Sequence, residues 1–173
     1  MTVGQLIDDA TRSIGDWPVA GVAFRDITPL LGAPDAFAQV VAALREQVEP
    51  YAPDAVVGVE ARGFLLGAPL ALALGVGFVP VRKQGKLPAD THEASYALEY
   101  GTATVEIHAD ALAPGARAVV VDDVLATGGT LNAAVDLVRR CGADPVAAAV
   151  MIELAALHGR EVLDIDCHAL RVY

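Results

Sequence analysis

The chain has 173 residues, of which 54% are hydrophobic and 20% are charged, and its formal net charge is −10 at pH 7. This composition excludes a disordered chain, and the acidic balance argues against a nucleic-acid partner, which needs lysine and arginine to neutralise its phosphates. The longest apolar stretch, residues 64–74, is too short and too interrupted by glycine and proline to cross a bilayer, so we expect no membrane partner.

The first part of the chain contains two amphipathic patterns. Apolar side chains recur at helical spacing over residues 3–14, and Thr2 suits the N-cap of that helix. Residues 34–48 predict a second amphipathic helix, which Pro50 and Pro53 would stop. Residues 17–29, between the two helices, are expected to be irregular.

From residue 55 onward, short apolar runs alternate with helical segments. We expect strands at 55–59, 77–81, 117–121, 146–152 and 167–172, and helices at 63–74 and 131–140. Residues 82–95 are polar and predict a long loop, followed by a hairpin with arms at 96–100 and 104–108. This order predicts an α/β fold with a mostly parallel central sheet flanked by helices. No linker or repeat interrupts it, so we expect one domain over residues 1–173.

Functional residues should gather at one edge of this sheet, because ligands bind outside the carboxyl ends of the strands in open α/β sheets. The segments expected at that edge are the loops that follow Val59, Val81, Val121 and Ile152. These loops also hold the unusual charged and glycine-rich residues of the chain.

The most informative stretch is residues 119–130, Val-Val-Val-Asp-Asp-Val-Leu-Ala-Thr-Gly-Gly-Thr. It predicts a buried strand, two adjacent carboxylates, a turn of small residues and a helix that starts at Leu131. The backbone N–H groups of residues 126–130 can converge on a phosphate where the helix N-terminus adds partial positive charge. Asp122 and Asp123 suit neutral hydroxyls or a metal better than a phosphate. A Thr-Gly-Gly-Thr turn alone would be an ordinary strand–helix connection, but the full combination favours a phosphate site.

This stretch resembles the PRPP (phosphoribosyl pyrophosphate) binding motif of type I phosphoribosyltransferases. The resemblance implies the type I phosphoribosyltransferase fold, with a hood or lid loop at about residues 82–103. It also implies that the two aspartates hold the ribose hydroxyls, directly or through waters of a Mg²⁺ ion bound to PRPP, and no other side chain is a candidate metal ligand. The PRPP- and phosphate-binding residues assigned in this way are Asp122, Asp123, Ala126, Thr127, Gly128, Gly129 and Thr130.

Two basic segments match the parts of that family that grip pyrophosphate. In Glu60-Ala-Arg-Gly-Phe64, an arginine beside a glycine can reach a phosphate oxygen, or can be a surface residue beside a helix cap. The resemblance assigns Arg62 to the pyrophosphate and implies a non-proline cis peptide at Glu60–Ala61. It gives the same role to a basic cluster that would otherwise suit a solvated loop, namely Arg82, Lys83 and Lys86.

The segments at residues 21–28 (Gly-Val-Ala-Phe-Arg-Asp-Ile-Thr), 98–101 (Leu-Glu-Tyr-Gly) and 105–108 (Val-Glu-Ile-His) resemble adenine phosphoribosyltransferases in particular. The resemblance implies that residues from about 14 to 30 bind the base. Phe24 would stack on adenine while the backbones of Ala23 and Arg25 bond to its edge, and Leu154 would close the other face. Without the resemblance, Phe24 would be interpreted as a core residue.

The segment at 98–101 would bring two residues of the lid to the substrates. Glu99 would lie near the base as the catalytic residue and help to manage its proton, and Tyr100 would cover the ribose phosphate. Composition alone would make Glu99 a surface residue of a half-exposed hairpin.

The resemblance thus implies a magnesium-dependent pentosyltransferase of purine salvage that converts adenine and PRPP into AMP and pyrophosphate, and a homodimer. The two cysteines, which have no metal-ligand spacing, and an N-terminus unlike a leader peptide favour the cytoplasm. One alternative is another base, such as hypoxanthine, xanthine or orotate, which the segments at 21–28 and 98–101 argue against. The other is a PRPP-sensing regulator without catalysis, which the net charge of −10 and the chain length disfavour.

Overall fold

The computed structural model describes residues 1–16, 24–97 and 101–173. Its strands are β1 (Arg12–Ile14), β2 (Phe24–Asp26), β3 (Ala55–Val59), β4 (Gly77–Lys83), β5 (Thr91–Ala97), β6 (Thr102–His108), β7 (Arg117–Leu125), β8 (Asp144–Glu153) and β9 (Cys167–Val172). Its α-helices are α1 (Val3–Ala10), α2 (Thr28–Leu31), α3 (Pro34–Val48), α4 (Arg62–Leu74) and α5 (Gly129–Arg140). The short 3₁₀ helices are η1 (Glu49–Tyr51), η2 (Ala155–Leu157) and η3 (Gly159–Val162).

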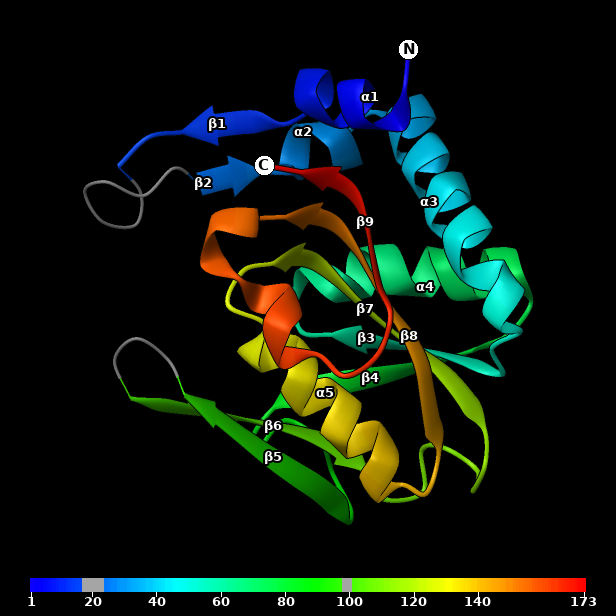
Figure 1. Ribbon diagram of the computed structural model, residues 1–173. Helices are drawn as coiled ribbons and strands as arrows, with labels where there is room; N and C mark the ends of the chain where they lie inside the picture. Colours follow the sequence, from blue (N-terminus) through cyan, green and yellow to red (C-terminus); the bar gives the residue numbers. More distant parts are fainter. Residues whose placement is uncertain (17–23, 98–100) are drawn as a thin grey trace.

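The described strands form a seven-stranded sheet in the order β5-β6-β4-β3-β7-β8-β9 and a separate two-stranded sheet of β1 and β2 (Figure 1). The five strands from β4 to β9 in this order are parallel to one another. β6 runs antiparallel to β4, and β5 antiparallel to β6. The predicted mostly parallel sheet is therefore confirmed, with an antiparallel hairpin at one edge.

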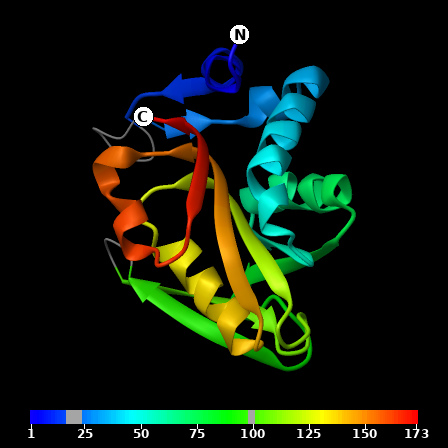
Figure 2. The same ribbon diagram turned by 45° about the vertical axis from the view of Figure 1, so that its right-hand side comes forward.

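Helices cover both faces of the parallel strands (Figures 1 and 2). Successive side chains of a strand point to opposite faces, so each buried strand supplies both layers of the core. In β3, Val57 packs in the hydrophobic cluster that contains α5. Its neighbour Val56 packs in the cluster that contains α1, α3 and α4. A strand that is buried on both faces explains the continuous valine-rich runs of the sequence.

The start of α4 lies against β7 because Gly63 has no side chain. A Cβ atom at Gly63 would lie 2.7 Å from the carbonyl oxygen of Val121 and 3.0 Å from Oδ1 of Asp122. Any other residue would push the helix away from the strand. The close approach brings Arg62, the first residue of α4, beside the acidic end of β7.

The predicted elements of the central sheet and its helices are confirmed, some with longer bounds. The helix at 34–48 and the strands at 55–59 and 167–172 have the predicted limits. The strand predicted at 117–121 continues to Leu125, so both aspartates lie within β7. No helix in the described parts of the chain is long and apolar enough to cross a membrane.

Two predictions for the first thirty residues were wrong. The helix predicted over 3–14 ends at Ala10, because Thr11 turns the chain with its N–H and hydroxyl both donating to the carbonyl of Ile7. Residues 12–14 then form an antiparallel strand pair with residues 24–26. Residues 24–26 belong to the segment that was expected to be irregular. Asp26 accepts hydrogen bonds from the N–H and hydroxyl of Thr28 and so orders the turn into α2.

The prediction of a long loop over residues 82–95 was also wrong. β4 includes Arg82 and Lys83, and β5 begins at Thr91, so only residues 84–90 connect them. β5 pairs with β6 over seven residues, from Thr91–His108 to Ala97–Thr102. The polar side chains concealed this strand because it lies at the edge of the sheet, with one face exposed. The arm predicted at 104–108 lies within β6, whereas most of the arm predicted at 96–100 lies outside the described residues.

Candidate active site

A cavity of about 510 Å³ opens at the carboxyl ends of the parallel strands. Its walls come from the ends of β3, β4, β7 and β8, as the strand order predicted, and from β2. A smaller cavity of about 60 Å³ adjoins it along residues 124–131. The predicted site residues that line the larger cavity are Phe24, Arg25, Arg62, Lys83, Asp122, Asp123, Ala126, Thr130 and Leu154. Those that line the smaller one are Asp122, Ala126, Thr127, Gly128, Gly129 and Thr130.

Of the remaining predicted residues, the two that the structure describes fall outside these walls. Arg82 and Lys86 do not line either cavity, although both belong to the segment that borders the larger one. Ala23, Glu99 and Tyr100 lie outside the described residues.

The smaller cavity has the features of an anion cradle. Gly128 has a φ of +82° and caps α5, which begins at Gly129. The first turn of α5 carries no acidic residue, whereas Arg139 and Arg140 lie in its last turn. No carboxylate of the first turn therefore compensates the positive end of the helix dipole. The N-terminal N–H groups of α5 border the smaller cavity, and this arrangement favours a bound phosphate.

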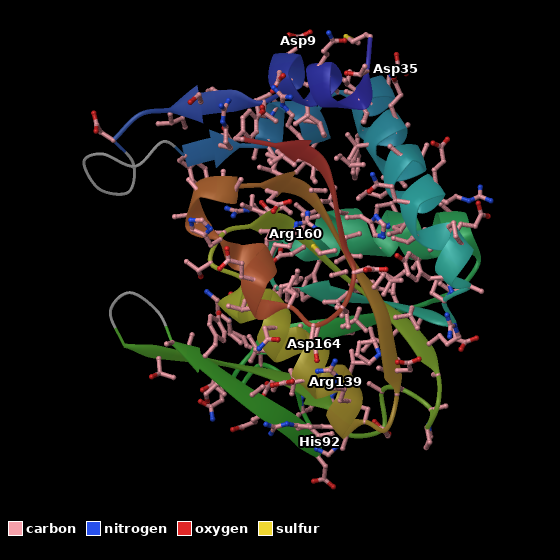
Figure 3. All side chains as sticks on the ribbon, in the orientation of Figure 1. Asp9, Asp35, His92, Arg139, Arg160 and Asp164 are labelled. Carbon is pink, nitrogen blue, oxygen red and sulfur yellow. The ribbon has the colours of Figure 1, made fainter. Side chains whose placement is uncertain are left out.

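A second backbone segment supports this cradle from behind. A Cβ atom at Gly159 would lie 2.1 Å from the carbonyl oxygen of Ala126, and one at Gly128 would lie 2.3 Å from the carbonyl oxygen of Gly159. Arg160, labelled in Figure 3, anchors the segment by donating to both carboxylate oxygens of Glu153 and to the carbonyl of Cys167. Contact of backbone with backbone leaves the cradle little freedom to shift.

The two aspartates at the end of β7 differ in their surroundings. The side chain of Asp123 is 4% exposed and accepts a 2.5 Å hydrogen bond from Nε of Arg62. Oδ1 of Asp122 accepts a hydrogen bond from the N–H of Asp123 at 2.8 Å. Desolvation and the neighbouring charge of Asp123 raise the pKa of Asp122 well above its usual value. A ligand that donates hydrogen bonds from hydroxyl groups, or a cation, would stabilise the ionised form of Asp122.

Arg62 connects three segments that are far apart in the sequence. Its guanidinium bonds to Asp123 and lies over the ring of Phe24, 5.4 Å from the ring centroid. Its side chain is still 45% exposed and is therefore accessible to a ligand. The peptide bond between Glu60 and Ala61 is cis, as the resemblance implied.

The basic segment at 82–88 is held by carboxylates and by β6. Glu60 accepts hydrogen bonds from the N–H of Lys83 at 2.9 Å and from Nε of Arg82 at 3.3 Å. The N–H of Lys83 is the largest cause that lowers the pKa of Glu60. Arg82 also donates to the carbonyl of Lys86 at 3.2 Å. These contacts order the backbone that carries the three basic side chains.

Glu106 of β6 is 3% exposed and holds the turn between β4 and β5. Its Oε1 accepts from the N–H groups of Lys86 at 2.8 Å and Leu87 at 2.7 Å. Burial raises the pKa of Glu106, but these N–H groups and that of Gly85 outweigh it, so the pKa is lowered. His108, two residues after Glu106 in β6, also contacts the turn: its Nε2 lies 2.6 Å from the carbonyl oxygen of Pro88. The turn is therefore fixed at both its N–H and its carbonyl groups.

The sequence and the fold of this chain are similar to those of known proteins. Residues 30–171 match the family model of the phosphoribosyl transferase domain. The adenine phosphoribosyltransferase of Thermobifida fusca is 56% identical over 169 residues, which span 97% of this chain and 96% of that protein. The solved structure of the adenine phosphoribosyltransferase of Thermoanaerobacter pseudethanolicus has a TM-score of 0.96 at 47% identity, covering 99% of this chain and 100% of that one.

The chain belongs to the adenine phosphoribosyltransferase family. The adenine phosphoribosyltransferase of Saccharomyces cerevisiae, solved with an imino-altritol bisphosphate and adenine, has a TM-score of 0.94 at 38% identity and covers 97% of this chain and 98% of that one. The family and the type I phosphoribosyltransferase fold, both predicted from the sequence, are confirmed.

Three residues of this phosphoribosyltransferase site were missed by the sequence analysis. Tyr96 lines the larger cavity, and a Cβ atom at Gly129 would lie 3.1 Å from its Cδ2. Gly159 supports the cradle, and Glu106 holds the basic turn. Glu106 lies in a segment that was noticed only for its resemblance, and a lone glycine or tyrosine gives no signal of a contact made across the fold.

We expect Gly159→Ala to impair PRPP binding. The added methyl group must displace the carbonyl of Ala126, and a shift of about 1 Å in a substrate-positioning segment can cost roughly 100-fold in rate. PRPP affinity by calorimetry and kcat/KM for PRPP should both fall. Gly77→Ala is the matched control, because a Cβ atom there meets nothing within 4 Å. Equal PRPP affinity in the two variants would contradict this role.

We expect Glu106→Ala to raise the KM for PRPP with little change in the KM for adenine. The variant removes a charged acceptor from two N–H groups, and such hydrogen bonds contribute about 1.5–3 kcal/mol each in favourable cases. Glu106→Gln should recover much of the loss, since an amide oxygen can still accept. Glu93→Ala, on the neighbouring strand with an exposed side chain, is the control. A parallel rise in both KM values would refute a specific effect on the pyrophosphate end.

Proposed function

We propose that this chain catalyses the reaction of its family, transfer of the phosphoribosyl group from PRPP to adenine to give AMP and pyrophosphate, in the 510 Å³ cavity. The observation that carries the proposal is that Phe24 and Leu154 line the same cavity as the aspartate pair, and that this cavity adjoins the anion cradle. A purine is flat and apolar on both faces, so it suits a slot formed by these two side chains.

The chemistry requires orientation and charge stabilisation. Nitrogen N9 of adenine attacks C1 of the ribose as pyrophosphate leaves, so positive charge develops on the sugar and negative charge on the leaving group. Lys83 borders the cavity, and Arg82 and Lys86 are carried by the backbone beside it. We assign these three side chains, with the exposed part of Arg62, to the departing pyrophosphate.

The aspartates are assigned to the ribose hydroxyls. A carboxylate accepts hydrogen bonds from hydroxyl groups but repels phosphate, so Asp122 and Asp123 fix the sugar between the cradle and the pyrophosphate. Among the described residues, no cluster of three or more acidic, histidine or cysteine side chains could enclose a metal. Two carboxylates beside a phosphate site fit Mg²⁺, which keeps several waters and would neutralise pyrophosphate charge when bound.

The base slot and the lid complete the proposal. Phe24 stacks on adenine and Leu154 closes the opposite face, while the backbones of Ala23 and Arg25 recognise the base edge. Glu99 acts on the proton of the base, and Tyr100 covers the ribose phosphate. The lid extends over residues 82–103 and excludes water, which would otherwise hydrolyse PRPP.

We also propose that the protein is a cytoplasmic homodimer formed by one domain. The support, besides the family resemblance, is α4, whose apolar sequence leaves Leu65 47% exposed and Leu72 83% exposed. The two leucines are seven residues apart and so lie on one face of the helix, and an exposed apolar helix face suits packing against another protein, which supports the dimer.

We expect turnover with PRPP and adenine, and none of comparable rate with hypoxanthine, guanine, xanthine or orotate. The assay follows pyrophosphate release at fixed PRPP and Mg²⁺ with each base in turn. Preferred turnover of another base would refute the adenine assignment. PRPP binding without turnover of any base would favour a PRPP-sensing regulator.

We expect Asp123→Asn to lower kcat/KM for PRPP by roughly 10- to 100-fold, because an amide is a weaker partner for ribose hydroxyls than a carboxylate. The fold should survive, since Arg62 is 45% exposed and remains solvated when its partner loses its charge. Thermal melting checks the second point. Asp164→Asn is the control: Asp164 is exposed, pairs with Arg139 at 2.8 Å (Figure 3) and lines neither cavity. Unchanged PRPP kinetics in Asp123→Asn would remove the ribose role.

A further inference from the structure

We propose that Tyr173 is a positioning residue for adenine, which joins the two walls of the base slot without touching the base. The inference rests on the proposed function of the slot. Tyr173 does not line the cavity, and its sequence context contains no motif. Its contacts nevertheless reach both Arg25 and the backbone on either side of Leu154.

The first wall of the slot needs an external support. Phe24 and Arg25 belong to β2, which pairs with β1 and with no strand of the seven-stranded sheet in the described parts of the chain. The central sheet therefore does not fix the position of β2 through strand pairing. The guanidinium of Arg25 lies over the ring of Tyr173, 4.0 Å from the ring centroid. This cation–π contact connects β2 to the end of β9.

The second wall is joined to Tyr173 by its backbone. The N–H of Tyr173 donates to the carbonyl of Glu153 at 2.9 Å, and its carbonyl accepts from the N–H of Ala155 at 2.9 Å. These bonds flank Leu154, whose own N–H donates to the carbonyl of Leu125 at 2.9 Å. Leu154 is thus placed between Tyr173 and β7.

The ring of Tyr173 is itself held in place. Its hydroxyl donates to Oδ1 of Asp8 at 2.6 Å, and the guanidinium of Arg171 lies 5.0 Å from its ring centroid. Arg171 completes the arrangement by bonding to Asp8, at 3.0 Å from Nε and 2.8 Å from Nη2. These contacts restrain the ring on which Arg25 stacks.

The spacing of the slot follows from these contacts. The backbone of Tyr173 is fixed beside Leu154, so its ring controls where Arg25 lies relative to Leu154 and hence how well the two walls fit a purine. The ring makes no contact with the phosphate cradle among the described interactions. The kinetic consequence is selective: the KM for adenine changes, and the KM for PRPP does not. A residue that only stabilised the fold would change both together.

The test compares Tyr173→Leu with Tyr51→Leu as the matched control. Tyr51 also bonds through its hydroxyl, to Asp166 at 2.8 Å and to Nε2 of His168 at 2.9 Å, but it precedes β3 and so lies at the opposite edge of the sheet. We expect Tyr173→Leu to raise the KM for adenine roughly tenfold, the loss expected for a partly desolvated cation–π contact. Tyr173→Phe, which keeps the ring, should stay within roughly threefold of the wild type. Tyr51→Leu should change neither KM.

A second variant separates the stacking contact from other effects. Arg25→Leu should raise the KM for adenine as Tyr173→Leu does, and the double variant should be no worse than either single one, because both remove the same contact. If Tyr173→Leu does not fold, Arg25→Leu and Tyr173→Phe are judged by the same two KM values.

An unchanged KM for adenine in the leucine variants, or an equal rise in both KM values, would overturn the role of Tyr173. Absence of adenine turnover in the wild type would instead overturn the proposed function, so the two failures are distinguishable.

Discussion

The ion pair between Arg62 and Asp123 determines how the pocket is organised. It joins the segment after β3 to the end of β7, and the same guanidinium reaches the ring of Phe24 from β2. Gly63 makes the pair geometrically feasible by allowing α4 to touch the backbone of β7. Because Arg62 compensates one of two adjacent carboxylates, two aspartates can stand beside an anion cradle without both being unpaired.

In the proposed binding mode, the two ends of PRPP meet different kinds of structure. The 5′-phosphate would meet backbone N–H groups, in a turn where glycines at 128 and 159 let two segments touch. The pyrophosphate would meet long basic side chains at the end of β4 and on the short turn that follows it, whose backbone is fixed by Glu60, Glu106 and His108. A fixed backbone with long side chains lets charge follow a leaving group while its point of attachment stays in place.

The sequence predicted what local patterns encode. The valine-rich strand, the aspartate pair and the small-residue turn of residues 119–130 are contiguous, so their chemistry and location could be inferred together. The edge strand β5 could not be recognised, because its hydrogen bonds come from β6 while its side chains are polar. The partner of Arg62 was missed for a related reason: Asp123 is 61 residues away, and the pairing depends on how closely α4 approaches β7. Contacts such as Gly159 with Ala126 likewise exist only once the chain has folded.

An acidic protein that binds a polyanion depends on local charge. A net charge of −10 repels PRPP, but at physiological ionic strength salt screens the repulsion between charges that are more than about 8 Å apart. Inside that distance, Arg62 and Arg82 are paired with carboxylates, whereas Lys83 and Lys86 have no ion pair among the described residues. Lys83, which lines the larger cavity, and the N–H groups at the start of α5, which borders the smaller one, therefore have no ionic partner among the described residues. A ligand with negative charge at both ends and hydroxyls between them satisfies this arrangement, and PRPP has that distribution.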